Sequence, residues 1–206
     1  MFNDKYGLTE AVLSGRKTMT RRIVPQHVFN KAEKYQEEYY NAALATISDK
    51  DAILSIATYE YRYRFPQVGE VVAIAQSYET IFKEESLYKK NRLIDIIRAG
   101  IIAKTCAGWN NKMFVNAKGM PHHIRITNIR VERLKDISDE DCLREGIIKR
   151  HFEEYDEYGY GFHGLPMSKY FCVPRDAFLT LIDKISGKGT WESNPYVFVY
   201  DFELVD

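Results

Sequence analysis

YVFVYDFELV, residues 196–205, alternates large apolar residues with smaller or polar ones and predicts a strand with one buried face. IRITNIRVER, residues 124–133, predicts a second long strand, with a bulge near Asn128 where its alternation slips. Shorter strands are predicted at residues 59–65, 71–75 and 113–115, and helices near residues 8–14, 28–54, 87–99, 138–145 and 178–185. Because strands and helices do not alternate regularly, we expect a mixed α/β fold centred on a small β-barrel rather than a parallel sheet.

The composition is that of a globular protein and excludes several classes. The 206 residues are 45% hydrophobic and 28% charged, and neither an internal repeat nor a linker separates two parts, so a single domain over residues 1–206 is expected. Lys and Arg total 29, as do Asp and Glu, which gives a net charge of zero. This balance argues against binding of nucleic acid by bulk charge and leaves room for a local basic cleft.

Cysteine and histidine spacing predicts neither a disulfide framework nor a metal site. Cys106, Cys142 and Cys172 lie far apart, which fits a reducing cytoplasm. His122 and His123 are neighbours that face opposite ways on a strand, and no HExxH motif is present. No cofactor is expected either. The chain contains no apolar run of about 18 residues and no signal-peptide pattern at its start, so a cytoplasmic protein without a membrane span is expected.

The densest chemical feature is GRKTMTRR, residues 15–22, which follows the end of a short predicted helix. An extended chain would place Lys17, Met19 and Arg21 on one face, and Thr18, Thr20 and Arg22 on the other. A cation beside a hydroxyl activates a nucleophile if burial lowers the pKa of the lysine enough for it to act as a base. The same cluster would also bind a phosphate, and a solvated basic turn is the third alternative.

Two further segments hold candidate residues. Ser138 is predicted to cap a short helix that ends at Glu145, where the helix dipole disfavours a carboxylate. Such a glutamate requires a cationic partner or a function, unless it is an ordinary surface residue. Asn194-Pro195 predicts a turn before the last strand, and Trp191 is either a core residue or a platform for base stacking.

Four segments in this order resemble the ASCH family: GRKTMTRR, VGEVVAIAQSY, RITNIRVERLKDISDEDCLREGI and WESNPYVFVYDFEL. The resemblance covers about residues 8–205 and implies a PUA-like β-barrel with flanking helices, and with helical insertions at about residues 24–66, 79–112 and 148–190. The arrangement looks especially like the larger ASCH proteins of gut bacteria and their phages, and it also resembles the much shorter, compact bacterial ASCH enzymes that hydrolyse N(4)-acetylcytidine. The compact enzymes have a β-branched residue where this chain has Arg21, and no glycine where it has Gly146.

The resemblance implies a cleft in which Lys17 is the base, Thr20 the nucleophile and Glu145 the proton donor, with Arg22 closing the motif. We therefore expect an RNA or a modified nucleoside as the partner, and hydrolysis of an acylated cytidine as the activity. The alternative is a non-catalytic RNA-binding module, and a metal-dependent ribonuclease ranks last. The further residues expected to contact substrate are Arg16, Arg21, Arg22, Trp109, Trp191 and Asn194. Residues 148–172, rich in aromatics and glycine, are expected to form either a mobile flap over the ligand or an ordered cap.

Overall fold

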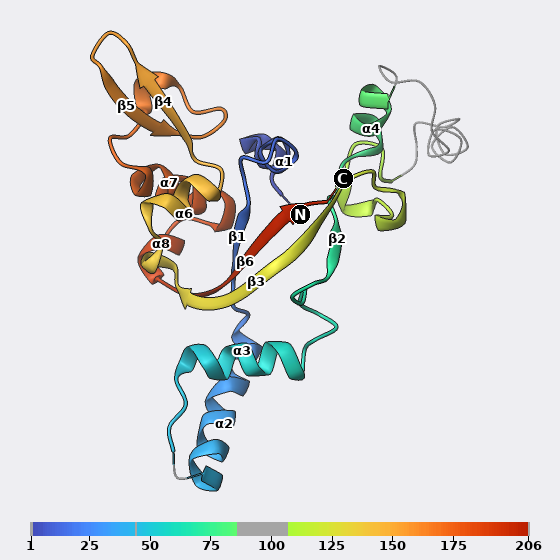
Figure 1. The fold of residues 1–206 in the computed structure, drawn as a ribbon, viewed down its shortest axis with the longest axis vertical. Coiled ribbons are helices and arrows are strands. Elements are labelled where there is room, and N and C mark those ends of the chain that lie inside the picture. Colours follow the sequence, from blue (N-terminus) through green and yellow to red (C-terminus); the bar gives the residue numbers. More distant parts are fainter. Residues whose placement is uncertain (1, 44, 86–106, 206) are drawn as a thin grey trace.

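A curled antiparallel sheet forms the centre of the molecule (Figure 1). The computed structural model describes residues 2–43, 45–85 and 107–205. Its main sheet has the order β1 (Met19–Ile23), β6 (Tyr196–Leu204), β3 (His123–Arg133) and β2 (Val71–Ala73), and every neighbouring pair is antiparallel. The described strands make a half-barrel, so the expectation of a mixed α/β fold with a curved antiparallel sheet is confirmed at that level.

The alternation along β6 divides the hydrophobic core between the two faces of the sheet. Phe198, Tyr200 and Phe202 belong to one buried cluster, together with residues of β3 and of helix α3 (Asp49–Tyr59). Val197 and Val199 point to the opposite face and pack in a second cluster with Met19 and with helix α7 (Pro174–Ser186). Two cores therefore share one central strand, because successive side chains of a strand point to opposite faces.

Helices surround the sheet, and α2 (Gln26–Ala43), α3 and α7 lie in segments that the resemblance marked as insertions. Helix α3 packs against β3 and against α2, and α2 extends away from the sheet, whereas α6 (Asp139–Arg144) and α7 lie beside the other end of the sheet (Figure 1). The remaining helices are α1 (Leu8–Leu13), α4 (Tyr78–Glu85) and α8 (Thr190–Ser193). A separate hairpin is formed by β4 (Ile148–Phe152) and β5 (Glu157–Gly161). No helix among the described residues combines the length and the apolarity needed to cross a bilayer.

Several elements appear as predicted. The register of β3 against β6 shifts between Ile126 and Asn128, which is the predicted bulge. The Ser138 side chain accepts a hydrogen bond from the Asp141 N–H and caps α6. Helix α7 contains the predicted apolar face. The strand β6 is present as predicted, but it is buried on both faces from Val197 to Tyr200 and not on one. The helix expected at residues 87–99 lies outside the described residues.

Other predicted elements are wrong in type or extent. Residues 59–65 do not form a strand: α3 runs to Tyr59, the Tyr61 N–H bonds back to Ile56, and Tyr63 is 87% exposed. Residues 112–114 form a 3₁₀ helix, and the helix predicted over 28–54 is divided into α2 and α3. The segment 148–172 contains the β4–β5 hairpin, a regular element where a loop was expected.

Candidate functional site

The GRKTMTRR turn is held directly against the end of α6. Helix α1 ends before Gly15, which has a φ of 71°, and the chain then reverses into β1. The Lys17 N–H donates to the Ala11 carbonyl at 2.7 Å, and the Thr18 N–H donates to the Arg144 carbonyl at 3.0 Å. These backbone hydrogen bonds bring two segments that are far apart in the sequence into contact and fix where Lys17 lies relative to Glu145.

Gly146 makes this approach possible. It has a φ of +104°, a left-handed conformation that residues other than glycine rarely adopt. A Cβ atom at this position would lie 3.2 Å from Leu8 Cδ2 and 3.6 Å from Lys17 Cδ. Gly146 therefore allows α6 to end close to α1 and to the Lys17 side chain.

Lys17 and Glu145 form a buried ion pair. The Lys17 Nζ lies 2.6 Å from Glu145 Oε2 and also donates to the Glu145 carbonyl at 2.7 Å. The two side chains are only 2% and 7% exposed. The Glu145 carboxylate, which the dipole of α6 disfavours at this end of the helix, thus has Lys17 as its cationic partner. Desolvation lowers the pKa of Lys17 below its ordinary value, because the loss of water opposes the attraction of Glu145 and the charges of Arg21 and Arg22 lower it further.

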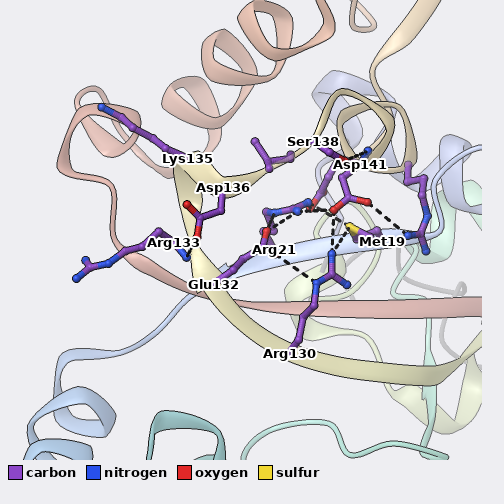
Figure 2. A network of polar contacts seen from close by, with 12 residues as sticks. Met19, Arg21, Arg130, Glu132, Arg133, Lys135, Asp136, Ser138 and Asp141 are labelled. Carbon is purple, nitrogen blue, oxygen red and sulfur yellow. Dashed lines mark hydrogen bonds and ion pairs between the residues drawn. The ribbon is translucent and has the colours of Figure 1, made fainter. Parts of the chain in front are cut away.

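Arg21 connects Glu145 to a network of carboxylates behind the pair, part of which Figure 2 shows. Its Nη1 lies 3.2 Å from Glu145 Oε1, and its Nη2 lies 2.6 Å from Glu132 Oε1 and 2.9 Å from Asp141 Oδ2. Arg130 approaches from β3 and also contacts Asp141, at 2.9 Å. The Arg21 side chain is 1% exposed, so its guanidinium binds protein carboxylates in place of the substrate phosphate that the sequence led us to expect.

One cavity of about 260 Å³ gathers the residues of the expected cleft. Lys17, Thr20, Arg22 and Glu145 all line it, as the resemblance implied, and Arg21 lies in its wall. We call this space the acid–base cavity. Its remaining wall is largely apolar and comes from Phe2, Leu8 and the face of α7 that carries Phe178, Leu181, Ile182 and Ile185. Sequence reasoning found the apolar face of α7 but did not connect it with the site.

The other residues expected to contact substrate lie outside the lining of this cavity. Arg16 is exposed in the turn. Trp109 packs against Phe82, and Trp191 packs edge-on against Phe178, so each tryptophan contacts another aromatic ring of the protein. Asn194 has a φ of 44° and accepts a hydrogen bond from the Lys135 N–H at 2.8 Å, which makes it a turn residue. The structure does not bring these four positions together with Lys17 and Glu145, and their contact with substrate stays a prediction.

Within the part of the chain that the structure describes, no group of three or more His, Cys, Asp or Glu side chains is arranged to hold a metal ion. The groups of the acid–base cavity are instead an amine, a carboxyl group and a hydroxyl, which suit proton transfer and nucleophilic attack. Comparison with models of protein families, with curated proteins and with solved structures found no match to this chain.

Proposed function

We propose that this protein is an amidohydrolase that cleaves the acyl group from an acylated cytidine of the N(4)-acetylcytidine type. One observation carries the proposal: a buried lysine–carboxylate pair 2.6 Å apart opens onto the same cavity of about 260 Å³ as Thr20. A few polar groups in a largely apolar wall are typical of a site for a small molecule. The resemblance to the ASCH family assigns the same three residues to this reaction.

The pair holds one proton that either residue can carry. Transfer of the proton from Lys17 Nζ to Glu145 along their hydrogen bond gives a neutral amine and a neutral carboxylic acid. Burial favours the neutral amine of Lys17, because desolvation lowers the pKa of this lysine. The transferred proton therefore leaves a base and an acid side by side, which is the combination that amide cleavage requires.

The proposed reaction has two steps, acylation of Thr20 and hydrolysis of the acyl-threonine. Neutral Lys17 takes the hydroxyl proton of Thr20, the Thr20 oxygen attacks the amide carbonyl, and Glu145 protonates the nitrogen as the carbon–nitrogen bond breaks. Cytidine leaves and an acyl-threonine remains. Water then attacks this ester while the Glu145 carboxylate accepts a proton from it. Charged Lys17 returns a proton to the Thr20 oxygen as the carboxylic acid departs, and the pair again holds one proton.

The RNA-binding alternative receives less support from the same geometry. It requires Lys17 and Arg21 to grip phosphates and the two tryptophans to stack bases. Lys17 and Arg21 are instead buried against carboxylates. Both tryptophans pack against phenylalanine rings and lie outside the lining of the acid–base cavity. Hydrolysis, in contrast, uses Lys17 and Glu145 in the buried pair that they form.

The test is release of cytidine from N(4)-acetylcytidine by the purified protein, detected by mass. Thr20→Val, which keeps the shape but removes the hydroxyl, is expected to abolish release. Thr18→Val is the matched control: Thr18 lies outside the cavity lining and is expected to keep most of the turnover. Absence of release by the wild type, or turnover that persists in Thr20→Val, would refute the proposal. Binding of short RNAs without turnover would support the alternative.

A further inference from the structure

A second cavity, of about 370 Å³, lies against the other face of the sheet, and we call it the inner cavity. Phe198 and Tyr200 of β6, Ile124 and Ile126 of β3, Val72 of β2 and Phe65 form much of its wall. Among the described residues that line it, Arg22 alone is charged. Protein interiors are close-packed, with few voids larger than a water molecule. An apolar space of this size beside a polar site is large enough to hold the apolar part of a small ligand.

The inner cavity adjoins the acid–base cavity at β1, and Thr20 lines only the acid–base cavity. Phe2, Arg22 and Ile23 line both spaces. In the β1–β6 register, Thr20 is opposite Tyr200 and Arg22 is opposite Phe198. Residues directly opposite each other in an antiparallel pair project from the same face. Thr20 therefore stands on the sheet face that carries the aromatic wall of the inner cavity.

The nitrogen and the acyl group of an amide bound at Thr20 would then lie on different sides of Thr20. Glu145, the proton donor for the nitrogen, lines the acid–base cavity and not the inner cavity. An amide carbonyl at Thr20 with its nitrogen toward Glu145 has its acyl chain directed to the opposite side, along the shared wall of Phe2, Arg22 and Ile23. The carboxylate product formed there would meet the positive charge of Arg22.

We infer that the inner cavity is a subsite for the acyl group and that the substrate has an aromatic or branched acyl group larger than acetyl. This inference rests on the proposed function and deepens it by naming the substrate class. The walls formed by Phe65, Phe198 and Tyr200 favour an aromatic ring, since aromatic groups pack well edge-to-face and offset. Phe65 and Pro66 belong to the segment at about residues 24–66 that the resemblance implies is an insertion, so this segment completes a wall that comes mainly from the strands of the sheet.

Val72 and Val71 give a matched pair of variants for the test. Val72 lines the inner cavity, and Val72→Phe would fill it. Val71 is the preceding residue of the same strand, is 48% exposed and lies outside the lining, so Val71→Phe adds the same bulk elsewhere. If Val72→Phe does not fold, Val72→Leu takes its place, because leucine fills less of the inner cavity.

The experiment compares N(4)-benzoylcytidine with N(4)-acetylcytidine. We expect the wild type to cleave the benzoyl compound with the higher kcat/KM. Val72→Phe should lower that preference by about 10- to 200-fold, the range typical of altered fit in an apolar pocket, and Val71→Phe should leave it unchanged. Equal preference in the wild type and Val72→Phe, or a wild type that prefers the acetyl compound, would overturn the inference.

Binding separates failure of the subsite from failure of the proposed function. Titration of uncleaved N(4)-benzoylcytidine and of benzoate, followed by NMR, is expected to perturb Phe198 and Tyr200 in the wild type and in Val71→Phe but not in Val72→Phe. This result without any turnover would refute hydrolysis and retain an aromatic-ligand site. Turnover of N(4)-acetylcytidine without such perturbation would retain hydrolysis and refute the acyl subsite.

Discussion

Lys17 and Glu145 occupy positions that cost folding free energy. Each charge is buried, and the mutual attraction of a buried pair often fails to offset the desolvation of both ions. Glu145→Leu alone leaves the buried Lys17 without its carboxylate and is expected to lower the free energy of unfolding by about 3–5 kcal/mol. Lys17→Met alone leaves Glu145 with Arg21 as its remaining cation and is expected to cost less. The double variant is expected to equal or exceed wild-type stability, by up to about 4 kcal/mol, while losing turnover. Urea unfolding of the four proteins measures this, and a double variant as unstable as the two losses added together would contradict it.

The same pair sets the pH dependence of the reaction. The active form holds one proton shared between Lys17 and Glu145, so the rate falls when the pair loses that proton. Because desolvation lowers the pKa of Lys17, this loss occurs below the ordinary value of 10.5. We expect kcat/KM to decline on the alkaline side before pH 10.5. A pH–rate profile that still rises through pH 10.5 would show that the proton of the pair is not used.

Arg21 is predicted to stabilise the site through its carboxylate partners. Arg21→Gln leaves Glu132, Asp141 and Glu145 without the guanidinium that they share and is expected to cost about 3–5 kcal/mol of unfolding free energy. Arg125 provides the control, because its pair with Glu203 is about half exposed on both sides. Arg125→Gln should change stability by no more than about 1 kcal/mol. Thermal or urea unfolding compares the two, and equal losses would contradict the assigned role.

At the scale of elements, the approach of α6 to α1 depends on Gly146. Gly146→Ala combines backbone strain, about 1–3 kcal/mol, with crowding against Leu8 and Lys17, and is expected to lower both stability and turnover. Gly187 has a similar φ of +110°, and a Cβ atom there would meet no other atom within 4 Å, so Gly187→Ala isolates the strain. Unfolding and cytidine-release assays on both variants check this. Turnover reduced equally in the two would show that the crowding at Gly146 does not matter.

The elements that sequence patterns predicted well are those with strong local signals. The bulge at Asn128 and the cap at Ser138 follow from a break in alternation and from a hydroxyl before an acidic turn. Residues 59–65 alternate as clearly, yet the chain continues from α3 into turns because its backbone hydrogen bonds return to Ile56 and Tyr61. Alternation indicates a strand only where a neighbouring strand is available to pair with it.

At the scale of the whole molecule, the acid–base cavity joins β1, the end of α6 and one face of α7. The ASCH resemblance supplied Lys17, Thr20, Arg22 and Glu145 as a group, which local patterns alone left separate. The carboxylates around Arg21 were not predicted, because Glu132 and Asp141 approach it only after β3 and α6 have packed against β1. The inner cavity likewise depends on the curvature of the sheet, which no single segment encodes.

The most direct test of the central claim is the kinetic and binding behaviour of Lys17→Arg with N(4)-acetylcytidine. A guanidinium keeps the positive charge but does not lose its proton in a protein, so it cannot act as a base. We predict that Lys17→Arg, verified as folded by circular dichroism, loses turnover by at least about 100-fold, the lower range for removal of an acid–base group. Its affinity for the nucleoside, measured by calorimetry, should change little. If the wild type is active and Lys17→Arg turns over N(4)-acetylcytidine at the same rate, the assignment of Lys17 as the base is contradicted.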